Sequence, residues 1–452
     1  MARGQRKQKL SARLVEDEEY QLRYERCAGI DVARASGVVC TRLPPQRDGG
    51  RRVSVTETVA ATVPAIAALA GRLLDDGVAM VSMESTPDYW RVWYYVLEAH
   101  GVAVQLVNSS AARQLAGRPK TDRADAQWLA RLTEMGLLRA SFVPPAQIRE
   151  LRDYTRMRVH LVHDRTRRYQ RLEKLLEGAL VKLTAVTSLT TASAKNMIAA
   201  MIAGERDPAV LAAMAQKRMK AKHQDLVAAL TGMMFGEHHA HLCRMLLNQI
   251  RYLGEDIEIL QDKITACLEA MPAAQGAAAG AGAAPDAAAL PTVHRLAQIP
   301  GVSEDLARSI IAETGLDMSR FPTAAHLVSW AGLAPVAHQS GPRARKPKKG
   351  QGDSYLRGYC TQAANGTAGT DTFPGERLRR IARRRGGARA RVAVARSILI
   401  IIWHLLNDPG ARFADLGPGH YASKTDKDKK TRNLICQLQA LGLDVTITPR
   451  AA

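Results

Sequence analysis

Residues 27–33 read Cys-Ala-Gly-Ile-Asp-Val-Ala, and this short run gives the clearest indication of the fold. The run is small and apolar apart from one charged residue, Asp31. A short apolar run of this kind is typical of a buried strand. A carboxylate inside such a strand needs a structural or chemical reason. Residues 37–43 and the alternating run 52–60 predict two further strands, and the Pro/Gly/Arg-rich residues 44–51 predict the hairpin loop between them.

The pattern then changes to alternating helices and strands. We predict a helix at 64–76 that starts at a proline, a strand at 78–84 and an aromatic-rich helix at 87–100. A strand at 102–108 and a helix at 122–134, with Thr121 as its N-cap, follow. Three strands followed by this alternation predict a mixed α/β sheet of the RNase H-like type.

Four acidic residues fall at informative places on these elements. Asp31 is in the first strand, Glu84 ends the strand 78–84, and Asp122 and Asp125 share one face of the first turn of helix 122–134. Each acid alone has a structural explanation, such as a strand end or a helix N-terminus. Together, four carboxylates in one site would repel each other unless cations share them, and Mg²⁺ prefers oxygen ligands. The four acids therefore predict a site for Mg²⁺, with two ions able to act on a phosphodiester.

The middle of the chain predicts a helical arm. Residues 148–177 form a basic helix, and a second helix at 243–271 carries apolar residues at alternating steps of three and four: Cys243, Leu246, Ile250, Leu253, Ile257, Leu260, Ile264 and Cys267. This seam indicates a coiled coil, which either joins two protomers or closes an intramolecular helical hairpin. The Ala/Gly-rich residues 273–289 predict a linker.

The C-terminal part predicts short helices and a basic loop. Ile-Pro-Gly-Val at 299–302, between helices at 293–299 and 303–314, is similar to a helix-hairpin-helix motif, whose turn meets a DNA phosphate. The alternative is an ordinary Pro-Gly turn. Further along, Ser340 stands in a loop rich in cations: Arg343, Arg345, Lys346, Lys348 and Lys349. Basic loops often contain serines, so spacing alone is weak evidence for a nucleophile.

Composition restricts the class of protein. The 452 residues are too many for one core, and a net charge of +21 indicates a polyanionic partner. The six cysteines form no CxxC pair, which favours reduced, buried thiols in the cytoplasm. Residues 1–13 do not look like a secretory signal, and the longest strongly apolar run, 398–406, is far shorter than the ~20 residues of a membrane helix. We therefore expect a cytoplasmic protein with no membrane partner.

We expect six segments. They are a mobile extension (1–26), an RNase H-like catalytic domain (27–145), the helical coiled-coil arm (146–272), the linker (273–292), a mostly helical C-terminal domain with the serine loop (293–410) and a tail (411–452).

Taken in order, the motifs resemble one known family. The chain is similar to the DEDD-type transposases of the insertion-sequence "one-ten" family, which are RNA-guided recombinases with a RuvC-like domain. The resemblance extends from about residue 27 to 408. The matching stretches are Gly-Ile-Asp31-Val-Ala, Met-Glu84-Ser-Thr, Lys-Thr-Asp122-Arg-Ala-Asp125-Ala, Ile-Pro-Gly-Val, Phe321-Pro-Thr-Ala, Gly332-Leu-Ala-Pro, Ser340-Gly341, Tyr355-Leu-Arg357 and Arg391-Val-Ala-Val-Ala-Arg396.

This resemblance implies roles for residues and partners. The four acids would be the metal site, and Ser340 would form a covalent phosphoserine link to DNA. A noncoding bridge RNA would pair with donor and target DNA, and the arm would assemble dimers into a tetramer. Besides the loop cations, we expect nucleic-acid contacts from Arg165, Arg167, Arg168, Arg171 and Arg357.

Two alternatives remain. The first is a metal-dependent nuclease similar to Holliday-junction resolvases, in which water attacks and Ser340 is a bystander. The second is a non-catalytic nucleic-acid scaffold, which the presence of all four acids disfavours.

Overall fold

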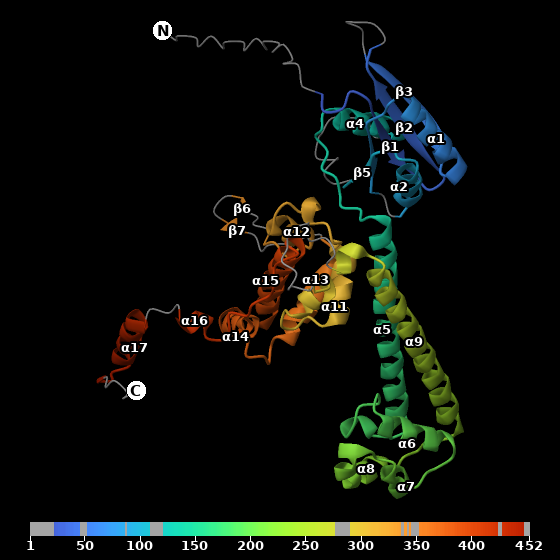
Figure 1. Cartoon of the computed structure of the whole chain (residues 1–452). Coiled ribbons are helices and arrows are strands. Elements are labelled where there is room, and N and C mark those ends of the chain that lie inside the picture. Colours follow the sequence, from blue (N-terminus) through green and yellow to red (C-terminus); the bar gives the residue numbers. More distant parts are fainter. Residues whose placement is uncertain are drawn as a thin grey trace, which may run out of the picture. The chain divides into compact units, whose positions relative to one another are not determined.

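The computed structural model describes residues 22–45, 52–85, 88–108, 121–275, 290–335, 339–340, 343–344, 352–423 and 427–446. The chain divides into two compact units, Met1–Val143 and Pro144–Ala452, and each is described by itself (Figure 1). The predicted linker residues 276–289 and most of the predicted N-terminal extension lie outside the described residues.

The N-terminal unit is built on a five-stranded mixed sheet. Its strands are β1 (Cys27–Val32), β2 (Ser36–Leu43), β3 (Val53–Ala60), β4 (Met80–Glu84) and β5 (Val104–Val107), in the order β3-β2-β1-β4-β5. The first three strands pair antiparallel, whereas β4 pairs parallel with β1 and β5 pairs parallel with β4. The mixed α/β sheet that the sequence predicts is confirmed.

Helices cover both faces of this sheet. On one face, α1 (Val63–Asp75) and α2 (Trp90–Ala99) share a buried apolar cluster with Ile30 of β1 and Met83 of β4. On the other face, α4 (Asp122–Glu134) places Ala126 and Ala130 against Cys40 of β2. The bounds of α4 are those predicted, and Thr121 accepts a hydrogen bond from the Ala124 N–H as its N-cap.

Hydrogen bonds attach residues 22–26, just before β1, to the rest of the N-terminal unit. The backbone N–H groups of Arg23 and Tyr24 both donate to the Glu134 carbonyl oxygen, at 2.9 and 3.2 Å. The Arg26 side chain donates to the Asp76 carbonyl oxygen. Within the described part of the predicted extension, residues 22–26 are therefore attached to the N-terminal unit.

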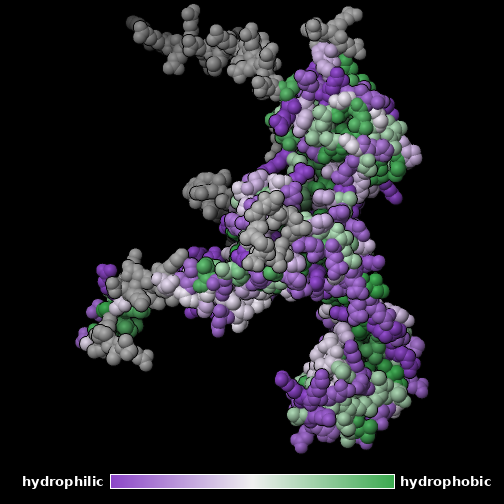
Figure 2. Space-filling model, viewed as in Figure 1, coloured by the Kyte–Doolittle hydropathy of each residue, from purple (hydrophilic) through white to green (hydrophobic). Residues whose placement is uncertain are grey.

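The arm consists of two long helices, α5 (Ala146–Gly178) and α9 (Glu237–Glu269), which pack along each other. At its tip lie α6 (Ala192–Ile202), α7 (Pro208–Ala213), α8 (His223–Leu230) and the short 3₁₀ helices η1 (Leu183–Ala185) and η2 (Lys217–Lys222). In Figure 2 the visible surface of the arm is mostly hydrophilic, with smaller hydrophobic patches.

The apolar seam of α9 is used within the chain. Cys243, Ile250, Ile257 and Ile264 are buried, and α5 is the long helix that packs against α9. The alternate seam residues Leu246, Leu253 and Leu260 are half-buried. This arrangement corresponds to the intramolecular hairpin, the second of the two alternatives. A coiled coil between protomers stays a prediction.

The rest of the second unit is mostly helical. Its helices are α10 (Thr292–Ala297), α11 (Glu304–Thr314), α12 (Ala324–Trp330), α13 (Ser354–Gly366), α14 (Phe373–Arg385), α15 (Gly387–Asn407), α16 (His420–Ser423) and α17 (Lys427–Ala440), with η3 (Pro272–Gln275) and η4 (Met318–Arg320). Two short strands, β6 (Gln339–Ser340) and β7 (Arg343–Ala344), pair antiparallel.

The turn between α10 and α11 is present where the sequence predicts it. Gly301 has a φ of 85°, which favours glycine, and Ser303 caps α11 by accepting from the Leu306 N–H. A Cβ at Gly301 would lie 2.1 Å from the Ala363 carbonyl oxygen, so this turn packs against α13. Its predicted role as a helix-hairpin-helix DNA contact stays a prediction.

One described helix, α15, is long and apolar enough to cross a membrane by length and composition alone. Its apolar residues include Val394, Ile398, Leu399 and Ile402, which are fully buried in the unit. The helix packs against α10, α12, α13 and α14. Its hydrophobicity is therefore explained by its central place in the C-terminal helices.

The cysteines are free thiols. Cys27, Cys40, Cys243 and Cys360 are buried, as the sequence predicts, and burial raises the pKa of Cys27 to about 12. Cys267 is half-buried and Cys436 is exposed on α17, so the expectation of buried thiols is wrong for these two residues.

Candidate active site and serine loop

Two of the predicted acids lie side by side on adjacent strands. In the parallel pair of β1 and β4, Ile30 is the register partner of Met83, so Asp31 and Glu84 occupy the next positions. Ile30 and Met83 both face the α1/α2 core, and side chains alternate along a strand. Asp31 and Glu84 therefore share the opposite face, which α4 covers. Glu84 is only 8% exposed, and Asp31 is half-buried.

The direction of α4 follows from its contacts with β1. The thiol of Cys27, at the start of β1, donates a hydrogen bond to the Ala130 carbonyl oxygen at 3.4 Å. Gly29 lies so close to the helix that a Cβ there would be 2.6 Å from the Ala126 carbonyl oxygen. Ala126 thus lies further along β1 than Ala130. The helix runs opposite to the strand, and its first turn is at the strand end that carries Asp31.

The other two acids are on that first turn of α4. Asp125 is half-buried and lies one turn before the buried Leu129, so it is on the side of α4 that faces the sheet. Asp122 is exposed at the first position of the helix. Asp31, Glu84 and Asp125 therefore share one end and one face of the sheet.

The donor set suits a hard divalent cation, because carboxylate oxygens are the ligands that Mg²⁺ prefers. Among the described residues, however, no group of three or more His, Cys, Asp or Glu side chains is close enough to hold a metal ion. The ligand type and the shared end of the sheet fit a metal site. Metal binding would require the carboxylates to draw closer together.

Ser340 lies in strand β6, where its register partner is Arg343 of β7. The loop cations Arg345, Lys346, Lys348 and Lys349 lie outside the described residues. The two ends of the loop meet at its base. The Asp353 N–H donates to the Trp330 carbonyl oxygen at 3.1 Å, and a Cβ at Gly352 would lie 2.4 Å from the Gly332 nitrogen. Only a glycine at residue 352 allows this close approach.

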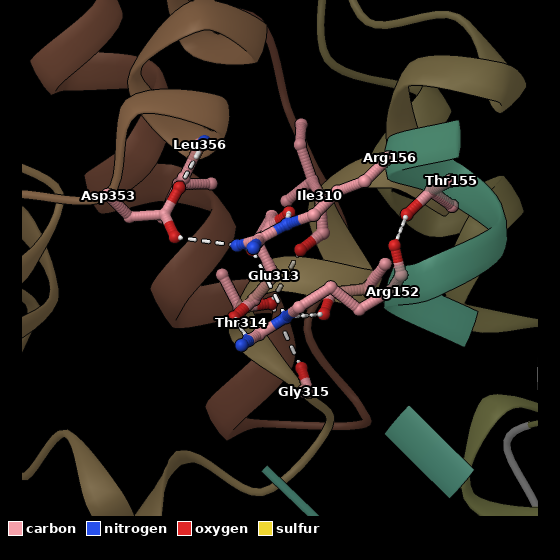
Figure 3. Close-up of polar contacts among 10 residues, drawn as sticks. Arg152, Thr155, Arg156, Ile310, Glu313, Thr314, Gly315, Asp353 and Leu356 are labelled. Carbon is pink, nitrogen blue, oxygen red and sulfur yellow. Dashed lines mark hydrogen bonds and ion pairs between the residues drawn. The ribbon is translucent and has the colours of Figure 1, made fainter. Parts of the chain in front are cut away.

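A buried ion-pair network holds the end of the serine loop (Figure 3). Asp353 caps α13, since its Oδ1 accepts from the Leu356 N–H at 2.7 Å. Its Oδ2 pairs with Arg156 Nη2 of α5 at 3.3 Å. Arg156 also forms a bidentate ion pair with Glu313 of α11, with Nε–Oε1 and Nη2–Oε2 distances of 2.9 and 2.8 Å. The network therefore joins α5, α11 and the start of α13.

Glu313 is fully buried, and a second arginine of α5 completes its surroundings. Arg152 Nε is 3.2 Å from Glu313 Oε2, and Arg152 Nη2 donates to the Glu313 carbonyl oxygen. Burial raises the pKa of Glu313, whereas the hydrogen bonds from Arg156 act in the opposite direction. Sequence reasoning missed this network. The available signal was an acid beside Ile310 and Ile311 on the buried side of a helix.

The predicted nucleic-acid contacts on α5 and α13 have mixed surroundings. Arg167 pairs with Asp164 and is exposed, as is Arg171. Arg165, Arg168 and the α13 residue Arg357 are half-buried. The α5 arginines are thus partly neutralised by acids of the same helix.

Comparison with known proteins identifies the family. Residues 28–181 match the DEDD transposase model of the IS110 group, and residues 293–373 match the model "Transposase IS116/IS110/IS902 family". Together these matches cover just over half of the chain. No curated protein sequence matches.

The solved structures that match include RuvC of Thermus thermophilus. The alignment has 16% identity, covers 26% of this chain and 99% of that chain, and has a TM-score of 0.20. The family models decide the matter: the chain belongs to the IS116/IS110/IS902 family of transposases, enzymes that cleave and rejoin DNA.

Proposed function

We propose that this transposase acts on DNA through two groups, a divalent-metal site at Asp31, Glu84, Asp122 and Asp125, and a nucleophilic Ser340. The observation that carries the proposal is the register of β1 and β4, in which Asp31 and Glu84 are neighbours on the face that α4 covers. Membership of a DEDD transposase family implies dependence on a divalent metal. Mg²⁺, as two ions, is the identity we propose.

The carboxylates would hold the ions beside the DNA phosphate that is to be cut. Bound ions would supply positive charge that neutralises the phosphate and stabilises charge on the reacting oxygens. The protein's own contribution is to fix the carboxylates at one end of the sheet. Gly29 serves this purpose, because it lets α4 lie close against β1.

The serine step is a transesterification. The Ser340 Oγ forms a bond to phosphorus while the bond from phosphorus to one deoxyribose oxygen breaks. A base takes the proton of the serine hydroxyl, and the deoxyribose oxygen takes up a proton and leaves as a free hydroxyl. The phosphoserine link keeps the energy of the phosphodiester, so a hydroxyl of a new strand can reverse the step without an external energy source. The cations around Ser340 in the sequence would bind the phosphate of that intermediate.

We further propose that a noncoding bridge RNA guides donor and target DNA, that protomers assemble as dimers or tetramers, and that the protein works in the cytoplasm. The net charge of +21 supports a nucleic-acid partner, and the α5 arginines are candidate contacts. The test is to purify the full-length protein at low salt and to sequence RNA bound to it. The flanking transcript is the noncoding RNA that we expect to be encoded in the DNA beside the gene. If the purified protein carries no RNA and its DNA cleavage does not respond to this transcript, the guide RNA is excluded.

The experiment for the metal site is Asp31→Asn, which keeps the shape of the side chain and removes its charge. We expect DNA cleavage in the presence of Mg²⁺ to fall below detection, because a metal ligand is lost. Asp75→Asn is the matched control, since Asp75 is an exposed acid at the end of α1 in the same unit. Equal cleavage by both variants would contradict the metal site.

A further inference from the structure

The segment that forms α14 and the start of α15 has an unusual charge distribution. Residues 377–407 contain nine arginines, no lysine, no aspartate and no glutamate. The two helices pack against each other, so the arginines at the end of α14 and the start of α15 are near one another. The exposed members are Arg380, Arg383, Arg384, Arg385, Arg389, Arg391 and Arg396.

Two acids near the start of α14, Asp371 and Glu376, pair with Arg379 and Arg383. Glu376 pairs with Arg379 at 3.4 Å and with Arg383 at 3.6 Å. Within the part of the chain that the structure describes, no ion pair involves the four residues around the connection between the helices, which we call the arginine corner: Arg384, Arg385, Arg389 and Arg391. The corner is therefore a concentration of uncompensated positive charge.

The arginine corner is more strongly charged than the basic helix α5. On α5, acids alternate with the arginines, and Asp164 pairs with Arg167. Residues 384–391 contain four arginines and no acid, and like charges this close repel each other. A polyanion that binds at the corner would remove this repulsion and gain the attraction of four cations.

The residue type and the space around the corner favour phosphate. Arginine presents a planar fork of donors that matches phosphate oxygens, whereas lysine is a point charge. The connection between the helices is open, because a Cβ at Gly386 or Gly387 would meet no atom within 4 Å. The four arginine side chains are themselves exposed, so a nucleic-acid backbone can reach them.

We propose that the arginine corner binds the phosphate backbone of a DNA duplex, independent of base sequence. DNA is favoured over RNA because α13, which begins at the end of the serine loop, packs against α14 and α15. The corner thus belongs to the same helical body as the residue proposed to attack DNA. The choice of DNA therefore rests on the proposed function, in which Ser340 attacks DNA, whereas phosphate binding by the corner depends neither on Ser340 nor on the metal.

The test is the salt dependence of DNA binding by the full-length variant R384Q/R385Q/R389Q/R391Q. Each phosphate contact contributes about 0.9 to the slope of log K against log salt, so four lost contacts should reduce the slope by about 3.6. The control is K217Q/R218Q/K220Q/K222Q, which removes four exposed charges from η2 at the tip of the arm. Its slope should change much less.

Two further measurements make the result decisive. The quadruple arginine-to-lysine variant keeps the charge, so most of the slope should be retained. Thermal unfolding of all variants should coincide, because the substituted side chains are exposed. An equal loss of slope in the corner and η2 variants would overturn the proposal, as would a loss seen with RNA but not with duplex DNA. Because only DNA binding is measured, failure here leaves the serine and metal proposals open to their own tests.

Discussion

Gly29 shows how a single residue sets the geometry of the candidate metal site. Its missing side chain lets the backbone of α4 lie against β1, and a Cβ there would be 2.3 Å from the Ala130 nitrogen. Real Cβ atoms do not approach backbone so closely, so any larger residue must push α4 away from the sheet. The helix that carries Asp122 and Asp125 would move with it.

We predict that Gly29→Ala destabilises the protein by about 1–3 kcal/mol, the usual cost of overpacking, and lowers DNA cleavage. Urea unfolding and a cleavage assay in Mg²⁺ are the measurements. Gly71→Ala is the control, because Gly71 lies in α1 and a Cβ there meets nothing within 4 Å. That substitution should stabilise the helix by about 0.5–1 kcal/mol. Unchanged stability of Gly29→Ala would show that α4 is not held as described.

Glu313 is the second residue whose loss has a predictable result. Glu313→Ala leaves Arg152 and Arg156 without their buried partner, and breaking a buried pair costs about 3–5 kcal/mol. The comparison variant is Glu255→Ala, which removes an exposed i,i+4 pair with Arg251 and should cost no more than about 0.5 kcal/mol. Denaturant unfolding measures both. Similar small losses in the two variants would mean that the network around Asp353 contributes little.

At the scale of elements, local patterns predicted most of the first unit. The alternation of 52–60 and the apolar runs at 27–33 and 78–84 became β3, β1 and β4, and α4 has the predicted bounds because capping and periodicity agree. The seam of α9 was also readable. Its partner was not, because a repeat of apolar residues does not specify which helix covers it.

The packing of α9 against α5 gives a test with neighbouring residues. Ile257 is 7% exposed, whereas Ile259 is 57% exposed. Ile257→Ala should cost about 2–5 kcal/mol through the cavity it leaves, and Ile259→Ala should change stability by no more than about 0.5 kcal/mol. Unfolding of the full-length variants, followed by circular dichroism, measures both. A reversed order would mean that the face of α9 that carries Ile259, and not the seam, is the buried one.

Across the whole molecule, the sequence could predict which residues are candidates for the metal site, but not the contacts between residues that are far apart in the chain. The acids at 31, 84, 122 and 125 were found from their elements, and the strand register brings Asp31 and Glu84 together. The network at Arg156 joins residues 157 and 197 positions away in the chain. No local pattern encodes such pairs, because each contact depends on how separate helices pack.

The central claim is that Ser340, rather than water, attacks the DNA. The measurement is to incubate the full-length protein with end-labelled target DNA, the flanking noncoding transcript and Mg²⁺, and then to look for a protein–DNA adduct that survives denaturation. We expect an adduct whose phosphoserine maps to residue 340 by mass spectrometry. We expect no adduct from Ser340→Ala and a normal adduct from Ser354→Ala, since Ser354 is the next serine in the chain. Cleaved DNA with free ends and no adduct, or an adduct that persists in Ser340→Ala, would contradict the claim.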